Sequence, residues 1–110
     1  MPLVLNYDIY VFRVDGDVLE IFPRGAFSHR IPLAWVGVTV QPSIKGRLVM
    51  RIRSARYDVP LYEVMQKAKI FPESSVELVI RTEEEPLFRQ FFTQVAELCG
   101  RSVVPITYGG

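Results

Sequence analysis

The sequence is poor in the residue types that most often carry chemistry. Its 110 residues include a single histidine, His29, and a single cysteine, Cys99. One cysteine excludes an intramolecular disulfide, and one histidine with one cysteine cannot form a zinc site without several carboxylates at ligand spacing. Gly16, Gly25, Gly37 and Gly46 are isolated and form no phosphate-binding loop. We therefore expect no enzyme, no cofactor, no metal site and no small-molecule substrate.

Strong net charge and long apolar runs are also missing. The net charge is +1, so no overall field favours nucleic acid as a partner. No apolar run approaches the roughly 20 residues of a membrane-spanning helix. The opening residues "MPLVLNYD" do not follow the pattern of a secretory signal, in which a basic leader precedes an apolar stretch. We therefore expect one domain, residues 1–110, located in the cytoplasm.

Strand signals dominate the first eighty residues. Several segments are rich in β-branched and aromatic residues or alternate apolar with polar residues, as strands do. They are residues 5–14, 18–22, 26–31, 35–40, 47–53 and 76–81. The sequence Asp15-Gly16-Asp17 lies between the first two and predicts a hairpin turn. Further turns are predicted at Pro23-Arg24-Gly25 and across 42–46. These signals together predict six or seven short strands.

The hydrophobic period changes after residue 85. From 86 to 99 the apolar residues are spaced by three and four, which predicts an amphipathic helix over about 85–99. Gly100 is a natural stop for this helix. Either Thr82 or Glu85 could be its N-cap residue. Phe88, Phe91 and Phe92 supply large apolar side chains, which we expect to close the open end of a curved sheet.

These elements together predict a mainly β fold with one C-terminal α-helix. The strands would form an antiparallel bent sandwich or barrel of six or seven strands, capped by the helix at about 85–99. The segment 102–110 ("SVVPITYGG") follows the helix and is too apolar for a free linker. It is predicted to be a C-terminal tail or an added strand.

This layout resembles the pleckstrin-homology (PH) superfold, and in particular the small bacterial PH-like domains of unknown function. The resemblance is carried by "DGDVLEIFPRG" (15–25), "HRIPLAWVGVTVQPSIKGRLVMRI" (29–52) and "VELVIRTEEEPLFRQFFTQVAELCGR" (76–101), and it covers roughly positions 4–101. It implies a bacterial, non-catalytic interaction module that binds protein and self-associates into a homo-oligomer.

Two features depart from the phosphoinositide-binding PH domains of eukaryotes. Those domains carry lysine and arginine in and beside the first hairpin turn, where this chain has Asp15-Gly16-Asp17. Those domains usually also have a tryptophan in the closing helix, where this chain offers Phe91 and Phe92. The first departure argues against recognition of inositol phosphates.

A row of basic residues is the best candidate for a binding face. Arg47, Arg51 and Arg53 occupy alternate positions of one predicted strand, so their side chains should share its outer face, with Lys45 and Arg56 near them. Guanidinium groups in such a row suit carboxylates or phosphates. The alternative is a solvated sheet face whose arginines pair with glutamates on neighbouring strands, such as Glu77 or Glu63.

Two functions follow for this face. In the first, the chain is a protein-binding module whose partner is an acidic protein surface or a second copy of itself. In the second, it is a peripheral membrane binder that contacts anionic lipid headgroups through the same arginines. Nucleic acid is not expected, because no aromatic side chains are interleaved with the arginines to stack on bases.

Overall fold

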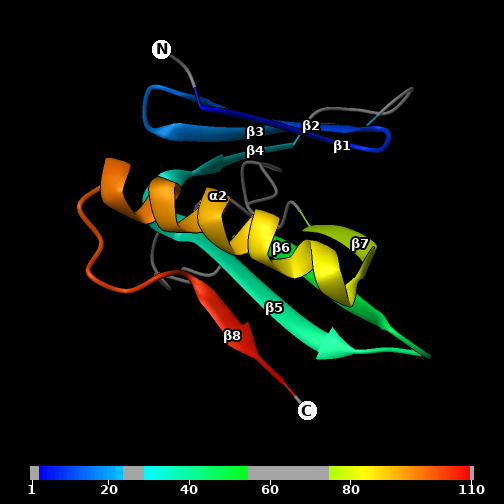
Figure 1. Ribbon diagram of the computed structural model, residues 1–110. Coiled ribbons are helices and arrows are strands. Elements are labelled where there is room, and N and C mark those ends of the chain that lie inside the picture. Colours follow the sequence, from blue (N-terminus) through cyan, green and yellow to red (C-terminus); the bar gives the residue numbers. More distant parts are fainter. Residues whose placement is uncertain (1–2, 24–28, 55–74, 110) are drawn as a thin grey trace, which may run out of the picture.

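The structure is a computed structural model that describes residues 3–23, 29–54 and 75–109, and these residues form two four-stranded sheets with a helix against them (Figure 1). The first sheet has the order β1 (Val4–Tyr7), β2 (Tyr10–Asp15), β3 (Val18–Pro23) and β4 (His29–Pro32), each antiparallel to the next. The second has the order β7 (Ser75–Arg81), β6 (Arg47–Ser54), β5 (Val36–Pro42) and β8 (Ile106–Tyr108).

The predicted fold class, mainly β with a C-terminal helix, is confirmed, but three of its details differ from the prediction. The described residues contain eight strands instead of six or seven. They form no closed barrel, because the two sheets are separate hydrogen-bonded ladders. The second sheet is also not purely antiparallel, since β8 runs parallel to β5.

The extra strand comes from a hairpin that the sequence pattern hid. Residues 5–14 were expected to form one strand, but β1 ends at Tyr7 and β2 begins at Tyr10. The loop between them is Asp8-Ile9, and Asp8 has a φ of 53°. Aspartate tolerates this left-handed conformation better than most residues, so a single Asp suffices to reverse the chain. The predicted turn at Asp15-Gly16-Asp17 is confirmed, with Gly16 at a φ of 61°.

The two sheets are joined at a sharp corner. Pro32 ends β4, a short 3-10 helix, η1 (Leu33–Trp35), follows, and β5 starts at Val36 in the other sheet. The prediction that a strand begins at Trp35 is therefore wrong by one residue. Proline suits this corner because it provides no hydrogen for a further ladder bond.

Helix α2 (Glu85–Leu98) runs across the opening between the sheets (Figure 1) and fills the core from there. Phe88, Phe91 and Phe92 are all buried, as their spacing predicted. The ring of Phe12 on β2 lies 5.9 Å from that of Phe88 and 6.1 Å from that of Phe91. The same apolar cluster contains the inward side chains of both sheets, listed here for the second sheet: Val36, Val38, Val40, Met50, Ile52, Val76, Leu78 and Ile80. One core therefore serves both sheets and the helix.

The two ends of α2 differ, because only the C-terminal end has a capping hydrogen-bond motif. The N-cap residue is Glu84, so neither Thr82 nor Glu85, the two predicted alternatives, has this role. The reason is a 3-10 turn, η2 (Thr82–Glu84), inserted between β7 and the helix. At the other end, Gly100 has a φ of 72° and Arg101 N–H donates to Ala96 O at 2.8 Å. This is the Schellman arrangement, and it confirms Gly100 as the stop.

The segment after the helix returns to the second sheet. Ile106, Thr107 and Tyr108 pair in parallel with Val38, Thr39 and Val40 of β5. Arg101 fixes the start of this segment, because its guanidinium donates to Leu33 O at 3.0 Å and to Val36 O at 2.9 Å. The Tyr108 hydroxyl donates to Glu85 Oε1 at 2.5 Å. Burial and this hydrogen bond raise the pKa of Tyr108.

Candidate functional site

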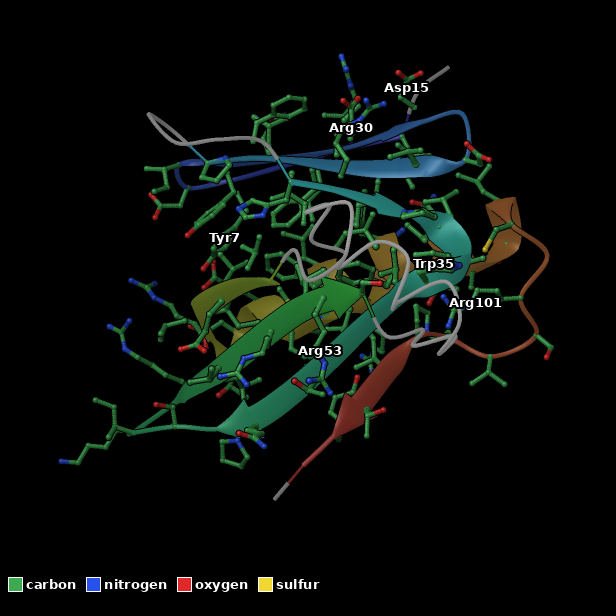
Figure 2. All side chains as sticks on the ribbon, turned by 180° about the vertical axis from the view of Figure 1, so that it is seen from behind. Tyr7, Asp15, Arg30, Trp35, Arg53 and Arg101 are labelled. Carbon is green, nitrogen blue, oxygen red and sulfur yellow. The ribbon has the colours of Figure 1, made fainter. Side chains whose placement is uncertain are left out.

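The predicted basic row lies on the outer face of the second sheet. Alternation along β6 buries Met50 and Ile52 and leaves Arg47, Arg51 and Arg53 exposed, as expected. Figure 2 labels Arg53 on this sheet. Because β6 is an inner strand, between β7 and β5, the row runs along the middle of the face and not along its edge.

A fourth arginine joins the row from β7. Arg81 is exposed and lies directly opposite Arg47 in the antiparallel ladder. Sequence reasoning missed Arg81 as a site residue. The available signal was the alternation of residues 76–81, which places Glu77, Val79 and Arg81 on the outer side of β7. Within the described part of the chain, the β6 and β7 side of this face thus carries four arginines and one glutamate.

Arg51 is the member of the row with a clear ion-pair partner. Its Nη2 lies 2.7 Å and its Nε 3.3 Å from Glu77 Oε2 on the neighbouring strand. This is the cross-strand pairing named above as the alternative for this face, whereas Glu63 lies outside the described residues. Both side chains are about half exposed, so such a pair contributes at most about 1 kcal/mol. Arg51 is therefore paired with Glu77, and the pair adds little to stability.

Lys45 lies in the exposed turn between β5 and β6, beside the end of the row. The turn is closed by Ser43 N–H donating to Arg47 O and by Arg47 N–H donating to Ile44 O, both at 3.0 Å. Gly46 has a φ of 68°, which a side chain would disfavour. The neighbouring Ile44 is 77% exposed. Arg56, the remaining residue predicted for this site, lies outside the described residues.

Arg47 and Arg81 form a like-charge pair at this end of the sheet. Residues directly opposite in an antiparallel ladder have Cβ atoms about 5 Å apart, and like charges there are destabilising. Glu84 is near them, but its carboxylate already accepts hydrogen bonds from the Arg81 backbone N–H and the Tyr7 hydroxyl, both at 2.9 Å. The charges of both arginines act on the Glu84 carboxylate, but neither guanidinium group forms a salt bridge with it.

The pKa values of this cluster reflect these contacts. The backbone hydrogen bond from Arg81 is the main cause that lowers the pKa of Glu84, with the Tyr7 hydroxyl and the charges of Arg81 and Arg47 acting in the same direction. Burial and the hydrogen bond to Glu84 raise the pKa of Tyr7 to about 12. Glu84 is therefore an anion and Tyr7 a neutral donor throughout the physiological range.

A second charged cluster, which sequence reasoning did not find, lies on the outer face of the first sheet. The buried carboxylate of Glu20 on β3 is 2.6 Å from Arg13 Nη2 and 3.5 Å from Arg30 Nε. The Arg13 guanidinium also lies 5.4 Å from the centre of the Phe22 ring. Figure 2 shows Arg30 and Asp15 on the side of this sheet that faces away from the core. Each cation here has a partner, so this face is less basic than the other.

Metal-ligating side chains do not cluster within residues 3–23, 29–54 and 75–109. No three histidine, cysteine, aspartate or glutamate side chains in these ranges lie close enough to hold a metal ion. Cys99 is the C-cap of α2, and its thiol donates to Ala96 O at 3.7 Å. His29 lies on β4, in the other layer of the fold.

Comparison with other proteins identified no relative: no protein-family model, no curated protein and no solved structure matches this chain. None of the helices in the described residues is long and apolar enough to cross a bilayer.

Proposed function

We propose that this chain is a non-catalytic PH-like interaction module, which binds an acidic protein surface through the outer face of its second sheet and self-associates. The observation that carries the proposal is the imbalance of charge on that face, where Arg47, Arg51, Arg53 and Arg81 stand against Glu77. The PH-like part is supported by the order of the described elements, in which the four strands β1 to β4 precede β5, β6, β7 and then an α-helix.

Protein binding fits this face for a geometric reason. The arginines surround Val79, which is 51% exposed, and the adjacent Val49, which is half-buried. An apolar centre with a charged rim is the usual anatomy of a protein interface. A mainly basic rim adds to the association rate and selects partners of the opposite charge.

The test is capture of native partners by charge-reversed variants. The variant Arg47→Glu/Arg53→Glu should lose the acidic partners that the wild type retains. The matched control Arg30→Glu/Arg89→Glu reverses two charges elsewhere on the surface and should retain them. Equal loss in both variants would show that only net charge matters and would refute the assignment to this face. Light scattering tests self-association, and a strict monomer at high concentration would contradict that part.

Anionic membrane binding is the second candidate, and Ile44 is the observation that favours it. An exposed isoleucine beside Lys45, at a turn, is suited to insertion between acidic lipid headgroups. Co-sedimentation with acidic and neutral vesicles, at low and high salt, separates the two candidates. Membrane binding predicts pelleting that needs acidic lipid and is reduced by Ile44→Ser, and its absence would remove this candidate.

A further inference from the structure

We propose that Arg47 and Arg81 form a subsite for one dianionic group, a phosphate monoester on a side chain of the partner protein. This inference rests on the proposed function, because the subsite is part of the same sheet face. The two guanidinium groups come from directly opposite positions of β6 and β7, and both are exposed.

Without a ligand, the two positive charges of Arg47 and Arg81 lie in an unfavourable arrangement. Arg51, four positions along β6, is opposite Glu77 and forms an ion pair with it. Arg47 is instead opposite another arginine, so the ladder places two cations where a cation and an anion would be more stable. A bound dianion converts this repulsion into two attractive contacts.

A phosphate monoester matches this pair of guanidinium groups in both charge and number of acceptor oxygens. A phosphate monoester carries between −1.5 and −2 charges near neutral pH and has three acceptor oxygens. Two adjacent guanidinium forks can each give paired hydrogen bonds to such a group, whereas a single carboxylate has two oxygens and one charge. Lys45, exposed in the turn next to Arg47, adds a third positive charge at the same end of the sheet.

Glu84, the described carboxylate whose pKa the charges of Arg81 and Arg47 help to lower, is held by other contacts. Glu84 Oε1 receives two hydrogen bonds, from the Tyr7 hydroxyl and the Arg81 backbone N–H, and these hold the carboxylate at the start of the helix. Among the described residues no carboxylate oxygen lies within 4.0 Å of a guanidinium nitrogen of Arg47 or Arg81.

A polypeptide is favoured over a lipid as the carrier of the phosphate, because the subsite is continuous with the rest of the face. Val79 lies two residues before Arg81 on β7, and Arg51 lies beyond it toward the other end of the sheet. A bound segment that placed a phosphate between Arg47 and Arg81 would therefore continue over Val79 toward further cations.

The experiment measures binding of an acidic peptide with one phosphoserine, the same peptide unphosphorylated, and phosphatidic acid vesicles. The wild type should bind the phosphopeptide more tightly than the unphosphorylated one by about tenfold or more, and Arg47→Gln or Arg81→Gln should remove that difference. The control Arg51→Gln removes an equal charge from the same strand and should keep it.

Thermal unfolding gives an independent reading. In chloride buffer, Arg47→Gln should leave Tm unchanged or raise it, because it removes the repulsion with Arg81. In inorganic phosphate at the same ionic strength, the wild type should gain Tm and Arg47→Gln should gain less, since only a bound ligand stabilises the folded state.

Three outcomes would overturn the inference. The first is equal affinity for the two peptides, and the second is a loss in Arg51→Gln as large as in Arg47→Gln. The third is that the vesicles bind and the phosphopeptide does not, with vesicle binding lost in Arg47→Gln. If the two peptides bind with equal affinity and Arg47→Glu/Arg53→Glu abolishes that binding, the proposed function stands while the subsite fails. If neither peptide binds, both fail.

Discussion

Replacement of Phe92 by alanine tests whether helix α2 is the common filler of both sheets. Phe92 is fully buried and belongs to the single apolar cluster. Truncation of a buried phenylalanine costs about 3–5 kcal/mol, through lost transfer free energy and the cavity that remains. Since a domain of this size is stable by about 5–15 kcal/mol, Phe92→Ala should remove a large part of its free energy of unfolding.

The assay is urea unfolding followed by both circular dichroism and the fluorescence of Trp35, the only tryptophan. Trp35 packs against the same core from the corner between the sheets. The two signals should therefore shift together to lower urea, because one core holds both layers. Leu87→Ala is the control, since Leu87 is on the same helix but 44% exposed, and it should cost less than about 1 kcal/mol.

Two results would refute this reasoning. A loss below about 1 kcal/mol in Phe92→Ala would mean that the helix does not fill the core as described. Separate transitions for the two signals would mean that the sheets unfold independently and share no core. The variant Phe92→Leu, which keeps most of the apolar volume, should recover much of the stability and guards against an effect unrelated to packing.

Three further perturbations follow from the contacts. Tyr7 has a folded-state pKa above its usual value of 10.0, so its contribution to stability is complete below about pH 10 and is lost as the pH rises toward 12. In Tyr7→Phe the free energy of unfolding should not show this loss between about pH 9 and 12. The same dependence on pH in the variant and the wild type would contradict it. Arg101→Met should lower the free energy of unfolding by about 1–3 kcal/mol, because Val36 O and Leu33 O lose this donor and, among the described residues, only Leu33 O keeps another, the Val36 N–H. Arg89→Met, whose exposed guanidinium lies 3.7 Å from Glu85, should cost under about 1 kcal/mol. Gly100→Ala should cost about 1 kcal/mol by denaturation, because its φ of 72° disfavours a side chain, and a neutral result would contradict the described helix stop.

The fold could be predicted where the pattern was local and periodic. Alternation over 47–53 correctly placed Met50 and Ile52 in the core, and the spacing of three and four found the buried face of α2. The β1–β2 hairpin was missed because Asp8 is followed by Ile9 and not by glycine, within a run of mostly strand-forming residues. Helix capping by Glu84 was missed because it depends on the preceding 3-10 turn.

The candidate site was only partly predictable, for a different reason. Arg47, Arg51 and Arg53 share one strand, so their common face follows from a period of two. Arg81 belongs to another strand, and its position opposite Arg47 depends on the register of β6 with β7. The docking of Arg101 on Leu33 O and Val36 O is likewise a contact between distant segments, which local sequence patterns do not specify.

The late position of α2 in the chain affects how this protein can be made in the cell. During translation all strands of the first sheet leave the ribosome before the phenylalanines that cover their apolar side. Until about residue 99 has emerged, Phe12 and its neighbours lack that cover, and nascent chains in this state are prone to aggregate. Slow elongation through the last third of the message should therefore increase the demand for chaperones. Faster translation of the codons for α2 should reduce that demand.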